Sequence, residues 1–139
     1  MFRFPSAYLA AAILCVACNT TASGQAIIDL VCSGAVQFYE HGTVTPTATR
    51  VDLEHNFIST PVGNFRIRKV EETKIWFEDD PGKQSTIQGH TAEGSLDRLS
   101  GQMTIWWQRP TERAKLRAGL SSQVGMSVEL RCSAPTRLF

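Results

Sequence analysis

The sequence predicts an all-β domain, built as a small antiparallel meander that closes into a barrel. Apolar and polar residues alternate with a period of two through most of the chain after residue 26, as expected for strands that bury one face. Short segments rich in Gly, Pro, Asn and Asp separate these runs and are typical of tight turns. Cys32 and Cys132 lie on the apolar parity of the first and last runs, so a bond between them brings the ends of the meander together. A two-sheet sandwich with this bond across its core is the alternative.

The alternation predicts eight or nine short strands. The first run places Leu30 and Val36 inward, and the last run does the same with Val128 and Leu130. The expected strands cover residues 27–38, 49–54, 57–60, 65–68, 74–78, 85–88, 93–97, 102–108 and 124–132. The expected turns cover residues 55–56, 61–64, 70–72, 79–83 and 98–101.

Two stretches lack the alternation. Residues 39–47 are polar and are interpreted as a loop. Residues 109–120 contain Pro110 followed by charged residues and alanine, which favours a short helix near 110–118, with a loop as the alternative.

Residues 1–24 have the features of a secretory signal peptide. Arg3 precedes a short apolar run, and small residues follow it. The run is shorter than the about 20 residues that a membrane span needs. Cleavage after Gly24, or alternatively after Ala26, leaves residues 25–139 as a single β domain that is exported to the periplasm or secreted. A buried N-terminal helix is the competing interpretation. A lipid anchor at Cys18 is a further alternative, although Cys15 stands where lipoprotein motifs usually carry Leu.

The two cysteines of the exported part are expected to form a structural disulfide. An exported protein enters an oxidising compartment, and Cys32 and Cys132 are the cysteines that remain. The exported part has no Cys-x-x-Cys motif, so a redox function is not predicted. Two free thiols, or a metal pair with a histidine, are the alternatives.

The charge balance argues against a nucleic-acid partner. Removal of residues 1–24, which contain one charge at Arg3, leaves 13 basic and 13 acidic residues. A neutral protein has no long-range field that would attract a polyanion or an anionic membrane.

The segment Leu96-Asp97-Arg98-Leu99-Ser100-Gly101 carries a turn motif. Asp97 is expected to accept hydrogen bonds from backbone N–H groups of the turn. Arg98 is expected to bond loop carbonyls or a carboxylate, and Gly101 to adopt a positive φ. A functional Asp97–Arg98 ion pair is the alternative interpretation.

This motif, the early Cys-Ser-Gly at 32–34 and the late Cys followed by Pro135 and Phe139 resemble those of small, exported, uncharacterised bacterial β-domain proteins. The resemblance spans most of the exported part through short motifs. It implies an exported β domain and no known activity. A second similarity is to bacterial lysozyme inhibitors, which are small exported barrels with a disulfide and a Ser-Gly loop that enters the lysozyme cleft. Ser100-Gly101 correspond to that loop, and the rest of its motif is absent here.

Two of the three tryptophans are expected on the outer, polar face. Trp107 has the core parity, whereas Trp76 and Trp106 have the opposite one. If their strands pair with matching faces, Arg66 lies opposite Trp76, with its guanidinium over the indole. Arg109 begins a basic segment next to Trp106. The sequence thus predicts a binding surface of these four outer residues. The alternative is that arginine stems, or the segment after Arg109, cover the rings.

The sequence has no recognisable catalytic or metal-binding constellation. Motifs of nucleophile elbows, phosphate loops, zinc proteases and calcium loops are absent. The histidines lack the spacing of metal ligands, and Asp79-Asp80 precede Pro81-Gly82 as turn formers. We therefore expect a non-enzymatic binding or envelope domain without a cofactor, whose partner is an envelope glycan, a small ligand or a protein. The alternative is an inhibitor of a secreted or periplasmic enzyme such as lysozyme.

Overall fold

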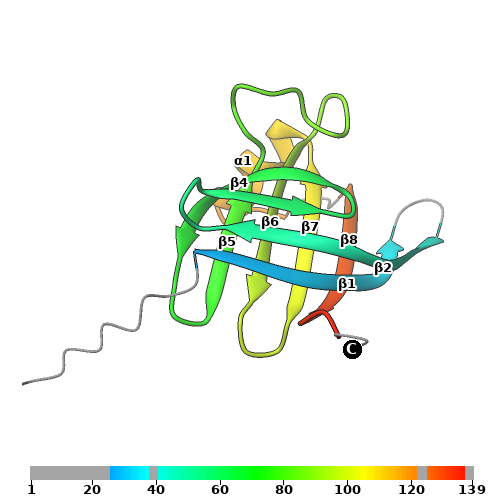
Figure 1. Ribbon diagram of the computed structural model, residues 1–139. Helices are drawn as coiled ribbons and strands as arrows, with labels where there is room; N and C mark the ends of the chain where they lie inside the picture. Colours follow the sequence, from blue (N-terminus) through cyan, green and yellow to red (C-terminus); the bar gives the residue numbers. More distant parts are fainter. Residues whose placement is uncertain (1–25, 38–40, 122–124, 137–139) are drawn as a thin grey trace, which may run out of the picture.

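The protein is an eight-stranded antiparallel β-barrel with one short helix (Figure 1). The computed structural model describes residues 26–37, 41–121 and 125–136. Each strand pairs with the next one in the sequence, and β8 pairs with β1 to close the barrel. The elements in chain order are β1 (Ile27–Gln37), β2 (His41–Asp52), β3 (Phe57–Thr60), β4 (Gly63–Val70), β5 (Lys74–Glu78), β6 (Thr91–Asp97), β7 (Gln102–Gln108), α1 (Pro110–Arg117) and β8 (Met126–Ser133). In Figure 1, β1, β2 and β4 run across the front, and β5–β8 cross behind them.

The predicted barrel is therefore confirmed in place of the two-sheet sandwich. The predicted signal peptide, residues 1–24, and the alternative anchor at Cys18 lie outside the described residues. Within the described part of the chain, no helix has the length and apolar character needed to cross a membrane.

Large side chains fill the inside of the barrel. Phe65 lies 5.4 Å from Phe77 and 6.4 Å from Trp107 between ring centroids, and all three side chains are buried. Gly94 faces this cluster from β6, where an added Cβ would lie 2.2 Å from Cε2 of Phe77. The glycine thus makes room for the ring. These rings fill this part of the barrel interior.

The predicted loop over residues 39–47 is wrong for its described part, because β2 begins at His41. This part of β2 pairs with β1 and extends the hairpin. The register shifts between Cys32 and Gly34, so that one more residue of β2 than of β1 lies between the flanking pairs. Pro46, which has no N–H to donate, lies within this bulge. Both faces of the extension are largely exposed, so its polar residues gave no alternating pattern.

The predicted strand at 85–88 is also wrong. Residues 79–90 form a long connection between β5 and β6, closed at its base by hydrogen bonds between Asp79 and Ala92 of 3.1 and 2.7 Å. Ile87 is the one apolar residue of the expected strand, and it packs onto the core from the loop. The expected strand at 49–54 is the end of β2 as far as Asp52, and its last two residues belong to the turn that follows. The strand expected from Val124 begins at Met126, with Val124 outside the described residues.

The predicted short helix is present as α1. Pro110 occupies its first turn, Glu112 lies near the N-terminus, and Lys115 and Arg117 lie near the C-terminus. The acidic residue at the N-terminus and the basic residues at the C-terminus interact favourably with the helix dipole, and proline is common in the first turn. No residue of α1 is buried, so polar contacts with the barrel must hold it in place.

Candidate functional site

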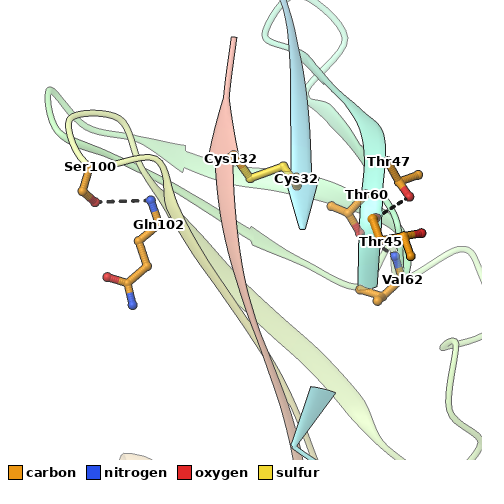
Figure 2. Close-up of a disulfide and its surroundings, with 8 residues drawn as sticks. All are labelled: Cys32, Thr45, Thr47, Thr60, Val62, Ser100, Gln102 and Cys132. Atoms are coloured by element: carbon orange, nitrogen blue, oxygen red, sulfur yellow. Dashed lines mark hydrogen bonds between the residues drawn. A yellow bond between two sulfur atoms is a disulfide. The ribbon is translucent and has the colours of Figure 1, made fainter. Parts of the chain in front are cut away.

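The predicted disulfide closes the seam of the barrel. Cys32 of β1 and Cys132 of β8 lie directly opposite each other and are bonded, with their Cα atoms 4.0 Å apart. Both side chains are buried. Figure 2 shows the bond between the Ser100–Gln102 turn on one side and threonines of β2 and β3 on the other. The first and last strands are thereby fixed to each other next to one end of the barrel.

A pocket of about 360 Å³ opens at this end of the barrel. Its apolar walls come from three strands that lie around the barrel, with Ile28 and Leu30 of β1, Ile75 of β5 and Leu96 of β6. Its rim consists of the turn between β6 and β7 and of the chain after β8. The rim residues are Asp97, Arg98, Leu99, Ser100, Gly101, Cys132, Ser133 and Ala134. We call this hollow the mouth pocket.

The turn between β6 and β7 has the hydrogen bonds expected for its motif. Oδ1 of Asp97 accepts the backbone N–H groups of Leu99 at 3.0 Å and of Ser100 at 2.8 Å. The N–H of Gly101 donates to the carbonyl of Asp97 at 3.0 Å, and Gly101 has a φ of 71°. The backbone N–H groups of Ser100 and Leu99 favour the ionised carboxylate and so lower the pKa of Asp97.

The same turn is fixed to its neighbours on both sides. Nη1 of Arg98 donates to the carbonyls of Glu71 and Glu72, at 3.2 Å each, in the turn between β4 and β5. On the other side, the N–H of Cys132 donates to the carbonyl of Gly101 at 2.8 Å. The charged groups of Asp97 and Arg98 thus bond backbone atoms, and the alternative of a functional ion pair is not supported. Leu99, at the tip, is 82% exposed.

The carboxylate of Asp97 is expected to give the protein an acid-dependent stability. Because the pKa of Asp97 in the folded protein lies below its ordinary value of 3.8, its stabilising contribution is complete above that value. The contribution is lost as the pH falls through the folded pKa. Asp97→Asn should therefore be less stable than the wild type at pH 7, and this difference should shrink below pH 3.8.

Urea unfolding of both proteins between pH 2 and pH 7 measures this difference. All other carboxylates titrate in both proteins, so their contributions cancel when the two curves are subtracted. A difference that stays constant over the whole pH range would show that the charge of Asp97 does not support the turn.

The predicted pairing of Arg66 with Trp76 is wrong. A register shift between Ile67 and Lys69 places Lys69 opposite Trp76, while Arg66 lies opposite Glu78 and binds it at 2.8 Å. Nε1 of Trp76 donates to a carboxylate oxygen of Glu71 at 2.8 Å, and a lysine ammonium lies 5.4 Å from the ring centroid. Trp76 is therefore a half-buried ring covered by neighbouring side chains.

Trp106 and Arg109 lie apart from Trp76. Trp106 is half-buried on β7 between Glu93 and Ser127, and β6 separates it from the strand of Trp76. Arg109 is exposed at the start of α1. Arg66 and Trp76 are thus not direct neighbours, and one strand lies between the strands of Trp76 and Trp106. A binding surface of these four residues stays a prediction.

A charge cluster attaches α1 to the outside of the barrel. Glu78 and Glu93 are direct neighbours on β5 and β6, and Nη2 of Arg113 on α1 binds both carboxylates, at 3.5 Å for Glu78 and closer for Glu93. Burial raises the pKa of Glu78, but the hydrogen bond from Arg66 and the charges of nearby arginines outweigh it and leave this pKa lowered. The outward parity of both glutamates was visible in the sequence, but their adjacency depends on the strand register.

The mouth pocket is the part of the site that the sequence did not reveal. Its wall residues have the inward parity of core residues, and only the closed barrel shows that they lie at its open end. Within residues 26–37, 41–121 and 125–136, no group of three or more His, Cys, Asp or Glu is placed to hold a metal ion.

The fold and this pocket define a small antiparallel barrel, fixed by a disulfide between its end strands, with a hollow of ligand size at one mouth. Comparison with protein-family models, curated proteins and solved structures found no match for the chain.

Proposed function

We propose that the protein is an exported binding module without catalytic activity, and that its ligand occupies the mouth pocket. The observation that carries this proposal is an apolar hollow of about 360 Å³ at the end of an otherwise packed barrel. Barrel mouths are frequent ligand sites, and small-molecule pockets span about 300–1,000 Å³. The walls of Ile28, Leu30, Ile75 and Leu96 favour an apolar group of the ligand.

The polar groups at the rim support binding rather than catalysis. The carboxylate of Asp97 accepts two backbone N–H groups, and Arg98 donates to two carbonyls. The hydroxyl of Ser100 accepts the N–H of Gln102 at 3.2 Å (Figure 2). These groups hold the turn, so the pocket offers shape and apolar contact to a ligand and no free acid–base pair.

The rim leucine provides the test of this proposal. Leu99→Ser should weaken binding of the fluorescent probe 1-anilinonaphthalene-8-sulfonate about tenfold, because loss of roughly 1.5 kcal/mol of apolar contact corresponds to that factor. Stability should change by less than about 0.5 kcal/mol, since Leu99 is exposed. Fluorescence titration measures the affinity, and urea unfolding measures the stability.

Leu116→Ser is the matched control, because Leu116 is also an exposed leucine but lies on α1 and does not line the mouth pocket. It should leave probe binding unchanged. Equal losses of binding in both variants, or none in either, would contradict the assignment of the ligand to the mouth pocket.

The export part of the proposal rests on residues 1–24. Intact-mass spectrometry under non-reducing conditions, on protein recovered from its own cells, should give a chain that starts at Gln25 and is two hydrogens light. A lipid-modified chain that starts at Cys18 would place the protein on a membrane. A chain that still contains Met1 and the full leader would contradict export.

The exposure of Leu99 favours a second candidate function, inhibition of a secreted or periplasmic enzyme such as lysozyme. A turn that is fixed on both sides and presents an apolar side chain loses little entropy when it enters an enzyme cleft. An excess of the protein should then slow lysis of a cell-wall suspension by lysozyme, and Leu99→Ser should reduce this effect. Unchanged lysis at excess protein would remove lysozyme as the target.

A further inference from the structure

The barrel wall has an open strand edge on the seam between β1 and β8. The pairing of β8 with β1 ends at Ser133, which lies opposite Val31. β1 itself begins four residues earlier, at Ile27. The first four residues of β1, Ile27–Leu30, therefore pair with β2 on one side and have no paired strand on the other within the described residues. We call this stretch the β1 edge.

Backbone groups of the β1 edge point toward the open side. The N–H of Leu53 donates to the carbonyl of Ala26 at 2.7 Å, so the backbone of residue 26 faces β2. In an antiparallel pair the direction alternates, and the N–H and carbonyl of Ile27 and Asp29 therefore face away from β2. Among the described residues, no backbone partner of these groups is seen on that side.

Pro135 explains why the described residues after β8 do not extend the ladder along this edge. If the register of β8 continued past Ser133, Pro135 would lie opposite Asp29. Proline has no N–H, so it cannot donate the ladder hydrogen bond that this position requires. Residues 134–136 are exposed and lie outside the strand. Within the described residues the edge is thus left unpaired.

Two hollows lie on the two faces of the β1 edge. Ile28 and Leu30 line the mouth pocket on the inner face. A groove of about 560 Å³ lies on the other side, next to Asp29 and Val31. Leu30 borders both hollows. The remaining lining residues of this outer groove are Ala48, Thr49, Arg50, Phe57, Ser59 and Pro135. Since successive residues of a strand alternate between faces, a strand added here would place its side chains in the two hollows in turn.

We propose that the β1 edge binds an extended segment of another polypeptide as an added strand, with an apolar side chain in the mouth pocket and the next side chain in the outer groove. This is the β-addition mode of peptide recognition, in which backbone hydrogen bonds give affinity and alternate pockets give specificity. The inference rests on the proposed function, because the same mouth pocket takes the apolar group, and it names the partner class as a peptide strand.

The charges at the edge specify an uncharged segment. Asp29 is the one charged residue of the β1 edge, and Nε of Arg50 binds its carboxylate at 2.8 Å. The outer groove is therefore electrically balanced. A segment with leucine-like residues at every second position and serine or threonine between them matches this surface. A charged residue of the bound segment would find no unpaired opposite charge in the outer groove, because Asp29 and Arg50 already bind each other.

A short synthetic peptide tests the proposal on the exported, disulfide-bonded protein. Acetyl-Thr-Leu-Thr-Leu-Thr-amide should shift the amide resonances of Ile27, Asp29 and Leu99 in the ¹⁵N-labelled protein. A twin peptide with alternate backbone amides N-methylated loses the N–H donors that face the protein and keeps the same side chains. It should bind at least tenfold more weakly, because it cannot donate to the edge.

A pair of variants tests the protein side of the same hydrogen bonds. Asp29→Pro removes one N–H of the open edge and keeps the bonds to β2, since the N–H of Asp29 faces away from β2. Asp29→Ala removes the carboxylate and its contact with Arg50 but keeps the N–H. Peptide affinity should fall at least tenfold in Asp29→Pro and less than twofold in Asp29→Ala, with thermal unfolding used to verify the fold of both.

Three outcomes would overturn the inference. Equal affinity for the N-methylated twin would show that the pocket binds side chains without an added strand, and the proposed function would stand alone. If the peptide shifts no resonance, strand addition is refuted. If 1-anilinonaphthalene-8-sulfonate also fails to bind, the proposed function is refuted too. Concentration-dependent shifts of the same resonances without peptide, lost in Asp29→Pro, would make a second copy of the chain the occupant.

Discussion

Loss of the Cys32–Cys132 disulfide is expected to lower the free energy of unfolding by about 4–5 kcal/mol. The bond joins residues 100 positions apart, so the loop that it closes spans most of the described chain. In the chain-entropy model a loop of this length greatly restricts the unfolded chain. Small domains are stabilised by only about 5–15 kcal/mol in total, so the variant should be close to unfolded. Urea unfolding of Cys32→Ala/Cys132→Ala against the wild type measures the loss.

Wild-type protein refolded in reductant is the control, because it lacks the bond and keeps both sulfur atoms in the core. It should lose nearly as much stability as the double variant if the bond acts on the unfolded chain. A reduced protein as stable as the oxidised one, alongside an unstable double variant, would instead assign the effect to packing of the buried sulfur atoms.

The closed barrel was predictable because its signals are local or lie at the ends of the chain. Alternation requires only that each strand bury one face, and β5–β8 show this clearly. The positions of Cys32 and Cys132 then placed the first strand beside the last. The turn at Asp97 was also predictable, since its hydrogen bonds form between residues within four positions of each other.

The outer surface was not predictable to the same degree, because it depends on the register of pairs that are distant in the sequence. Arg66 lies opposite Glu78, and the register shift after Ile67 places Lys69, in place of Arg68, opposite Trp76. The bulge near Pro46 likewise conceals the start of β2. Bulges change the pairing by one residue, and a change of one residue alters which side chains meet.

The mouth pocket escaped prediction for a different reason. Leu30 and Leu96 have the parity of core residues, and nothing local indicates that the barrel is open where they lie. The opening arises because β8 does not pair with the first four residues of β1, Ile27–Leu30. The turn at Gly101 lies beside this unpaired stretch. Such a feature is a property of strand lengths around the whole barrel.

Gly101→Ala is expected to lower the free energy of unfolding by about 2–4 kcal/mol. The residue has a φ of 71°, a conformation that disfavours any side chain. An added Cβ would also lie 2.2 Å from the carbonyl oxygen of Cys132, so β8 or the turn must move. Because this turn forms part of the rim of the mouth pocket, probe binding should weaken as well. Urea unfolding and probe titration measure the two effects.

Gly119→Ala separates the two causes, because Gly119 has a φ of 72° and, among the described residues, no contacting atom within 4 Å of an added Cβ. It should cost about 1–2 kcal/mol at most, which is the effect of the left-handed conformation alone. The additional loss in Gly101→Ala then measures how closely the turn approaches Cys132. If both variants lost the same stability and bound the probe equally well, the turn would not be held against β8, and the rim of the mouth pocket would not depend on this contact.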